Sequence, residues 1–223
     1  MIDIYEIKKQ FRKDTFLYIL HAIAERPLLF TDIKKKTGMD DSLVDYYLKR
    51  LQELRIIGKT PWGTYYLIEK IPFCYLCSRI REIIYVGLLG QKHYHTEPEP
   101  ITAIRLLKKE GYKINDVIVI TTRTAISTWG TVNEDILSII TVEDKDILSI
   151  EKMTNIIFNI VDKQSRKTAI ILDCTSLTKP ATIAMYNIST KYLIPLIYIY
   201  EQTKQLHWIL RPEDIGKMLR NIF

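Results

Sequence analysis

The chain has 223 residues, of which 47% are hydrophobic and 26% charged, and this balance excludes intrinsic disorder and collagen-like repeats. Its 32 basic and 26 acidic residues give a formal charge of +6, divided as +3 in residues 1–72 and +3 in residues 73–223, so neither part is a basic tail. The length suggests two domains. Three cysteines cannot form a disulfide framework, the acidic N-terminus is unlike a signal peptide, and the apolar runs are too short for a membrane span. We therefore expect a cytoplasmic protein.

The first expected domain, residues 1–72, has the periodicity of three helices. Apolar residues recur at helical spacing over 16–24. A short helix capped by Thr31 or its neighbour is expected through Ile33 and Lys36, and it stops at Gly38. A third helix, with an apolar stripe over 43–54, follows the N-cap carboxylates of Asp40 and Asp41.

A hairpin is predicted after the third helix, because β-rich runs at 56–60 and 64–68 flank the turn Pro61-Trp62-Gly63. This order of elements resembles the winged helix-turn-helix family over about 55 residues. The resemblance lies in LLFTDIKKKTGMDDSLVDYYLKRLQELRIIGKT followed by GTYYLI. It implies that the third helix enters the major groove and that the hairpin wing follows the DNA backbone or the minor groove.

The candidate DNA contacts lie opposite the apolar stripe of the third helix, on the second helix and on the wing. Acidic residues at Asp40, Asp41 and Asp45 share this surface, so contact with another protein is the alternative. The predicted base and phosphate contacts are Ser42, Tyr46, Lys49 and Arg50, and the predicted backbone contacts are Lys34, Lys35, Lys36, Lys59 and Trp62.

Residues 73–82 are predicted to be a linker, and they contain the pair Cys74 and Cys77. One C-x-x-C pair supplies two ligands where a structural zinc site uses four, so a zinc site requires two copies of the chain. The alternative, which we favour, is that both cysteines are small buried residues of a linker helix or an interface. We therefore predict no metal and no cofactor.

Residues 83–223 alternate strands with helices, a pattern that predicts a Rossmann-like α/β sheet with an antiparallel end. A threonine-rich loop is expected from the second strand to Thr131, and a terminal helix from Pro212. The expected strands are 83–89, 117–121, 136–142 and 168–173, followed by a hairpin of 194–200 and 206–210; a helix is the alternative for 136–142.

The fourth of these strands ends in a loop suited to a phosphate or a ribose. Asp173 is followed by the hydroxyls of Thr175, Ser176 and Thr178, and then by Lys179 before a helix. In a doubly wound sheet, ligands bind beyond the carboxyl ends of the strands, close to helix N-termini. The chain has neither the glycine-rich dinucleotide fingerprint nor a Walker A motif, so these two cofactor classes are poorly supported.

The loop resembles the strand-to-helix motif of CRISPR-associated Rossmann fold (CARF) domains, although Ser176-Leu177 stands where a pair of glycines is frequent. The resemblance implies a homodimer that binds a cyclic oligoadenylate of antiviral CRISPR defence across its two-fold axis. Lys179 would then contact phosphate, and the loop hydroxyls would line the adenosine sites beside Asp173. The cleft would be completed by Leu89, Gly90, Gln91, Thr122, Arg123 and Thr124.

Three functions follow from these observations. The first is a homodimeric transcriptional regulator that binds double-stranded DNA and senses a cyclic oligoadenylate, with cyclic tetra-adenylate as the main candidate. The second is a metal-independent ring nuclease in which Lys179 stabilises the developing charge. The third is a DNA-binding regulator with another nucleotide or metabolite effector. The loop residues His93, His95, Glu97 and Glu99 are not assigned a catalytic or metal-binding role.

Overall fold

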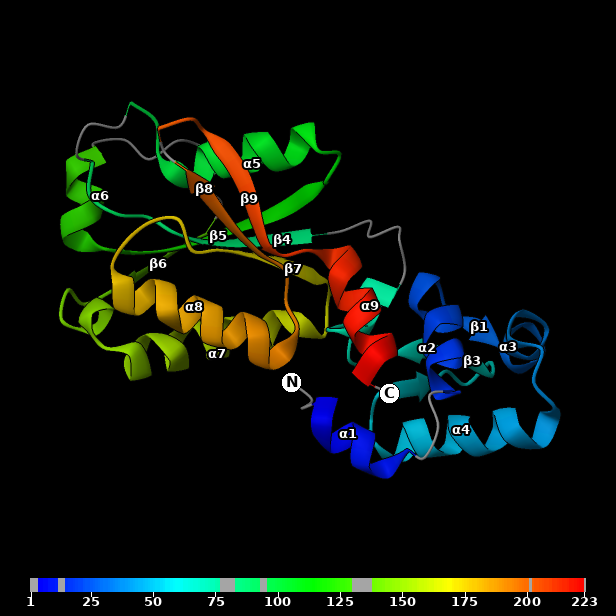
Figure 1. The fold of residues 1–223 in the computed structure, drawn as a ribbon. Helices are drawn as coiled ribbons and strands as arrows, with labels where there is room; N and C mark the ends of the chain where they lie inside the picture. Colours follow the sequence, from blue (N-terminus) through cyan, green and yellow to red (C-terminus); the bar gives the residue numbers. More distant parts are fainter. Residues whose placement is uncertain are drawn as a thin grey trace.

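The computed structural model describes residues 4–11, 15–76, 83–92, 96–129, 138–200 and 202–222. These form a helical unit with a small sheet and, beside it, a larger sheet with helices on both faces (Figure 1). No helix within those ranges is long and apolar enough to cross a lipid bilayer. The predicted fold class, a winged helix-turn-helix followed by a Rossmann-like α/β domain, is confirmed.

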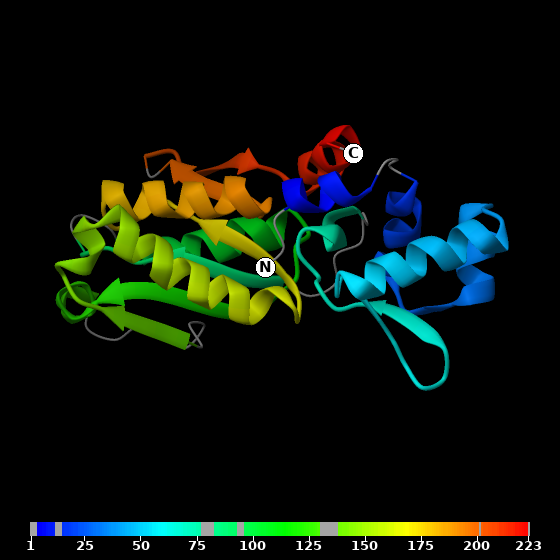
Figure 2. The same cartoon turned by 90° about the horizontal axis from the view of Figure 1, so that it is seen from below.

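The N-terminal unit is a winged helix-turn-helix. Its apolar helix faces meet in a core to which Phe16, Ile33, Leu48 and Leu51 contribute fully buried side chains. The hairpin of the wing projects from this core (Figure 2). Its elements are α1 (Ile4–Gln10), α2 (Phe16–Glu25), β1 (Leu28–Leu29), α3 (Phe30–Thr37), α4 (Asp41–Glu53), β2 (Ile57–Lys59) and β3 (Thr64–Leu67), and its three strands have the order β1-β3-β2.

Two elements and one helix start differ from the sequence-based expectation. Helix α1 and the two-residue strand β1 were not predicted; α1 is anchored by Phe11, whose ring stacks on Phe16 with 4.1 Å between centroids. Helix α3 begins at Phe30, and its N-cap position, Leu29, provides no side-chain hydrogen bond, so the predicted cap at Thr31 is wrong. The other predicted helices and the wing agree with the structure to within a few residues.

The second unit is a six-stranded sheet in the order β6-β5-β4-β7-β8-β9, parallel except for the last strand. Strands β4 and β7 are buried along their whole length, as expected for central parallel strands covered on both faces. The strands are β4 (Ile83–Leu88), β5 (Ile114–Thr122), β6 (Ser138–Val142), β7 (Ala169–Asp173), β8 (Leu196–Tyr200) and β9 (Gln205–Leu210).

Helices cover both faces of this sheet. Helix α5 (Glu99–Lys109) lies on one face, and α7 (Ile150–Ser165) and α8 (Lys179–Tyr192) lie side by side on the other (Figure 1). The predicted threonine-rich loop after β5 is wrong, because residues there form α6 (Arg123–Trp129), with Thr122 as its cap. The short 3₁₀ helix η2 (Asp146–Leu148) precedes α7.

The two units meet at the linker and at the C-terminal helix. The first part of the predicted linker is a 3₁₀ helix, η1 (Phe73–Leu76), and residues 77–82 lie outside the described ranges. The C-terminal helix α9 (Pro212–Ile222) returns from the sheet and packs against η1, which also packs against α2 (Figure 1). The linker is therefore held between the winged helix and the end of the chain.

Candidate functional site

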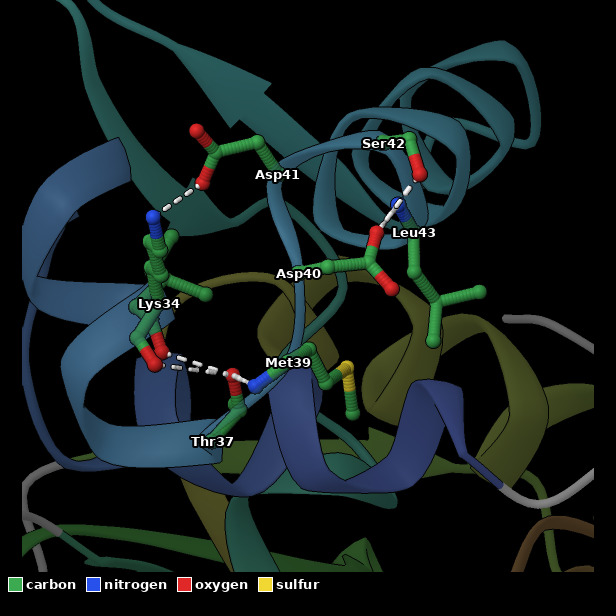
Figure 3. A network of polar contacts seen from close by, with 8 residues as sticks. Lys34, Thr37, Met39, Asp40, Asp41, Ser42 and Leu43 are labelled. Atoms are coloured by element: carbon green, nitrogen blue, oxygen red, sulfur yellow. Dashed lines mark hydrogen bonds and ion pairs between the residues drawn. The ribbon is translucent and has the colours of Figure 1, made fainter.

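The turn between α3 and α4 fixes how the expected recognition helix is presented. Gly38 ends α3 in the left-handed conformation, with φ of 70°, which glycine adopts without steric cost. The Asp40 carboxylate then accepts hydrogen bonds from the Ser42 hydroxyl (2.6 Å) and the Leu43 N–H (2.8 Å), and these bonds lower the pKa of Asp40 (Figure 3). The predicted cap at Asp40 is thus confirmed.

Asp41 has a different role from Asp40. Its carboxylate lies 2.6 Å from Lys34 Nζ, so an ion pair joins the first turn of α4 to α3 (Figure 3). Lys36 forms a similar exposed pair with Glu25 at 3.0 Å. Exposed pairs of this kind contribute little net stability, so a phosphate can replace the carboxylate at low cost.

The exposed face of α4 combines aromatic, hydroxyl and charged groups. Ser42, Tyr46 and Lys49 lie on this face, and 58% of Tyr46 is exposed. Asp45 lies 2.6 Å from Lys49 Nζ, and its hydrogen bond raises the pKa of Lys49. Arg50 turns toward α1, where its guanidinium donates to Gln10 Oε1 at 3.0 Å. The structure therefore groups three of the four predicted contacts of α4.

The wing adds a second element to this surface. Trp62 stands at the tip of the hairpin and is 87% exposed. Lys59 lies on β2 with its Nζ 5.1 Å from the centroid of the Tyr65 ring, a cation–π contact that holds the stem of the side chain. Lys35 of α3 is exposed as well. Whether these residues contact DNA stays a prediction.

The second site lies where the strand order of the large sheet reverses, between β4 and β7. The loops after these two strands are joined by a hydrogen bond from Gly90 N–H to Ser176 Oγ, 2.7 Å long. A Cβ atom at Gly90 would lie 2.8 Å from that Oγ and 3.3 Å from Leu177 N, so a side chain here would displace the Ser176 hydroxyl. This joint between the two loops is called the loop joint below.

The carboxyl of Asp173 is 1% exposed and organises the β7 loop from inside. It accepts hydrogen bonds from Tyr85 Oη (2.5 Å) and from the Thr175 N–H (2.8 Å) and hydroxyl. Burial raises the pKa of Asp173, and burial together with the Asp173 charge raises the pKa of Tyr85 well above its usual value. Tyr85 therefore remains a phenol that donates to the carboxyl.

The predicted ligand hydroxyls of this loop already have partners within the chain. Thr175 Oγ1 accepts from Ile199 N–H at 2.9 Å, and Thr178 caps α8 and donates to the Ile147 carbonyl. These bonds, with the loop joint at Ser176, fix the shape of the loop. Lys179, next to this loop, is exposed, and the assignment of the hydroxyls to adenosine stays a prediction.

Lys179 is the first residue of α8 and is exposed, and within the described residues it forms no ion pair. The positive end of the helix dipole favours an anion at this position, although Pro180 has no N–H and the Ala181 N–H already donates to Thr178 Oγ1. Leu177, two residues earlier, has φ of 78°, in the left-handed region that favours glycine. Leu177 therefore has a backbone conformation that glycine adopts at lower cost.

The residues predicted after β4 and β5 divide into two groups. Leu89 is buried, and its carbonyl accepts from Thr121 Oγ1 at 2.8 Å, whereas Gln91 is exposed. Arg123 instead lines a hollow of about 480 Å³ together with the segment 141–144, which contains the end of β6 and the first two residues after it. The hydroxyl of Thr124 donates to Asp144 at 2.8 Å, which draws that side chain to the same place.

Two contacts of the site were not foreseen from the sequence. Tyr85 lies within an apolar strand, so its hydrogen bond to Asp173 had no sequence signal. Trp129 Nε1 donates to the Gly90 carbonyl at 2.8 Å and ties α6 to the loop joint.

Burial raises the pKa of Cys174 to about 12, so its thiol is not ionised at neutral pH. His93, His95 and Cys77 lie outside the described residues, and the described ones contain no group of three metal-ligating side chains.

Comparisons with known proteins bear on each unit. The family model of bacterial regulatory proteins, arsR family, matches residues 14–59. Among curated proteins, none matches the chain. Three solved structures similar to the chain are Can2 from Sulfobacillus thermosulfidooxidans in complex with cyclic tetra-adenylate, Enterococcus italicus Csm6 bound to cyclic hexa-2'-fluoro-hexa-dAMP, and protein VC1899 from Vibrio cholerae.

These structural similarities are partial. The Can2 structure is 19% identical with a TM-score of 0.41, and the match covers 57% of this chain and 34% of that one. Csm6 is 13% identical with a TM-score of 0.45, and the match covers 64% of this chain and 45% of that one. VC1899 is 14% identical with a TM-score of 0.45, and the match covers 59% of this chain and 34% of that one. The chain thus spans less than half the length of each of these proteins. The matched range 14–59 contains α2, α3, α4 and β2, and the wing continues beyond it to Leu67, so the winged helix-turn-helix domain is of the arsR type.

Proposed function

We propose that the chain is a homodimeric DNA-binding transcriptional regulator whose sheet domain senses a cyclic oligoadenylate, with cyclic tetra-adenylate as the first candidate. The observation that carries the ligand proposal is the loop joint at the switch point of the sheet, beside the outward-facing Lys179. One cation at the positive end of a helix dipole suits a phosphodiester. The resemblance of the β7 loop to the CARF motif selects a cyclic oligoadenylate within that class.

The DNA-binding part of the proposal is supported by the arsR-type domain and by the exposed face of α4 with the Trp62 wing. The test is fluorescence anisotropy with duplex DNA over a series of salt concentrations. Lys49→Ala should weaken binding and reduce the salt slope by about 1, as expected for one phosphate contact. The matched control is Lys152→Ala, because Lys152 forms a comparable exposed pair, 2.7 Å from Asp146, on the sheet domain. Equal affinity of the two variants would contradict the assigned face.

The ligand-binding part is tested by isothermal titration with cyclic tetra-adenylate. Lys179→Ala should lower the affinity at least about tenfold, the effect of losing one charge-assisted contact. Lys191→Ala is the control, since Lys191 lies at the opposite end of the same helix. Absence of binding to the wild type at high micromolar ligand would refute the ligand proposal.

The same samples test two further parts of the proposal. Chromatography of the ligand after incubation shows whether the ring is opened, and linear products would assign the chain to the ring nucleases. Sedimentation velocity gives the mass of the particle, and a monomer in the presence of ligand would refute the homodimer. The affinity for DNA should differ between the free and the ligand-bound protein, because a regulator requires the ligand to prefer one state.

A further inference from the structure

Strand β7 is attached to the linker at the end opposite the loop joint. The sheet register pairs β8 with Leu172 and Asp173, near the carboxyl end of β7. At Ile170, near the start of β7, the hydroxyl of Tyr75 takes the place of a neighbouring strand: it donates to the Ile170 carbonyl (2.7 Å) and accepts from the Ile170 N–H (3.0 Å). A residue of the linker thus completes the hydrogen bonding of a central strand.

Tyr75 is suited to this double role. It is 4% exposed, and burial raises its pKa well above the usual value, so the phenol keeps the proton that it donates. Phenylalanine at this position would leave a buried N–H and a buried C=O of Ile170 without this partner. Unpaired buried backbone groups are strongly unfavourable, so the hydroxyl determines whether η1 remains attached to β7.

A second contact joins the same two segments. Arg166 ends α7, three residues before β7 begins, and its Nε lies 3.1 Å from Oε1 of Glu69. Glu69 follows the wing in the chain, and its side chain is only 6% exposed. The chain that enters β7 is therefore held at two points: Arg166 by Glu69, which follows the wing, and Ile170 by Tyr75 of the linker.

The linker in turn packs against the winged helix. Helix η1 lies between α2 and α9, and Leu17 and Tyr18 of α2 line a cavity of about 230 Å³ together with Leu76 of η1 and Arg220 of α9. On the other side, α9 approaches the linker so closely that a Cβ at Gly216 would lie 2.9 Å from the Tyr75 carbonyl oxygen. A shift of η1 would therefore displace α2 as well.

We infer that β7 is the mechanical link between the loop joint and the winged helix, with Tyr75 and Glu69 as the positioning residues. This inference rests on the proposed function, because it describes how that ligand site would be connected to the DNA-binding domain. All five residues of β7 are buried, and Asp173 at its carboxyl end holds the loop after β7 by its hydrogen bond to Thr175. Packed interiors transmit displacement rather than absorb it, so a movement of the loop reaches Ile170 and then Tyr75.

Hydrogen exchange of the full-length chain without ligand tests this link directly. Tyr75→Phe should lower the protection of amides in both β7 and α2 by at least about tenfold, because the two segments open together once the linker is released. Tyr186→Phe is the matched control, since Tyr186 is an exposed tyrosine on α8. Loss of protection in β7 with α2 unchanged would overturn the inference.

Glu69→Gln provides a second variant if Tyr75→Phe does not fold. It keeps the size of the side chain but removes the charge that faces Arg166, so it should reduce the protection of the same two segments by a smaller factor. If Tyr75→Phe does not fold, and Glu69→Gln folds but leaves hydrogen exchange in α2 unchanged, the inference is also overturned.

Binding measurements separate this inference from the proposed function. With cyclic tetra-adenylate, the ratio of DNA affinities with and without ligand should move toward one in Tyr75→Phe, while the affinity for the ligand itself stays within about threefold of wild type. A merely structural role would lower both affinities and leave the ratio unchanged. If the wild type binds no cyclic tetra-adenylate, the ligand proposal fails, and the exchange result alone decides whether β7 and the winged helix are linked.

Discussion

At the scale of single residues, the buried carboxyl of Asp173 makes stability depend on pH. Burial raises its pKa above the usual 3.8, so the folded chain keeps a proton that the unfolded chain has already lost. The stabilisation is complete below the unfolded pKa and is lost as the pH rises through the folded pKa. In chemical unfolding at several pH values, wild type should therefore lose stability relative to Asp173→Asn over this window.

The slope of this loss cannot exceed about 1.4 kcal/mol per pH unit, which corresponds to one proton. Asp116→Asn is a suitable control, because Asp116 is exposed on β5 of the same sheet. If wild type instead gains stability over Asp173→Asn as the pH rises, the hydrogen bonds from Tyr85 and Thr175 outweigh the cost of burying the charge.

The loop joint gives a second prediction at the residue scale. Gly90→Ala should destabilise the chain by about 1–3 kcal/mol, since the new Cβ lies within 2.8 Å of Ser176 Oγ and displaces a hydrogen-bonded group. In a Ser176→Ala background that oxygen is absent, so the same substitution should cost less. Unfolding of the four proteins in urea measures this coupling, and strictly additive effects would mean that the two side chains do not meet.

At the scale of elements, α4 carries a carboxylate beside each of its cations, Asp45 beside Lys49 and Glu53 at 2.8 Å from Arg50. Asp45 lies next to Lys49, so DNA phosphate must compete with it. Asp45→Asn should raise the affinity for DNA about threefold at low salt, with a smaller gain at high salt where the charges are screened. The control is Asp146→Asn, the partner of Lys152 on the other domain, and a similar gain there would indicate that only net charge is involved.

Elements with strong periodicity could be predicted from the sequence, and those held by tertiary contacts could not. The apolar stripe of α4 and the continuous apolar run of β4 determine both their type and their position. Helix α6 was missed because it is short and rich in threonine, and it is held by Trp129 and by the cap at Thr122. Helix α1 was missed because its seven residues are largely polar, and its anchor is the stacked Phe11.

The candidate ligand site divides in the same way. The position of the loop after β7 could be predicted because a polar segment follows a buried strand. The direction of its side chains could not, because Tyr85, Ile147 and Ile199 are distant in the chain and take up the loop hydroxyls and the Asp173 carboxyl. Only Lys179 is left outward-facing among the predicted charged groups of this loop, within the residues that the structure describes.

At the scale of the whole molecule, the two units are joined through long-range contacts that no local pattern reveals. Tyr75 and Ile170 are 95 positions apart, and the segment that contains Tyr75 gives no sign that its hydroxyl completes a strand. The equal division of the basic surplus between residues 1–72 and 73–223 fits two anion sites, duplex DNA at one and a nucleotide at the other. Under the proposed function, the contacts of Tyr75 make the linker a part of the mechanism and more than a passive spacer.

Gly216 provides the decisive prediction at this scale, because two effects oppose each other there. In the middle of α9, replacing glycine by alanine should stabilise the helix by about 1 kcal/mol through helix propensity. The added Cβ would, however, lie 2.9 Å from the Tyr75 carbonyl oxygen, a backbone atom that cannot move away cheaply. Thermal unfolding of Gly216→Ala should therefore show a lower midpoint than wild type, whereas Lys217→Ala, on an exposed position of α9, should be close to neutral. A stabilised Gly216→Ala protein would mean that helix propensity dominates and that α9 does not pack tightly against the linker. The contact of the two units through α9 and η1 would then have to be abandoned.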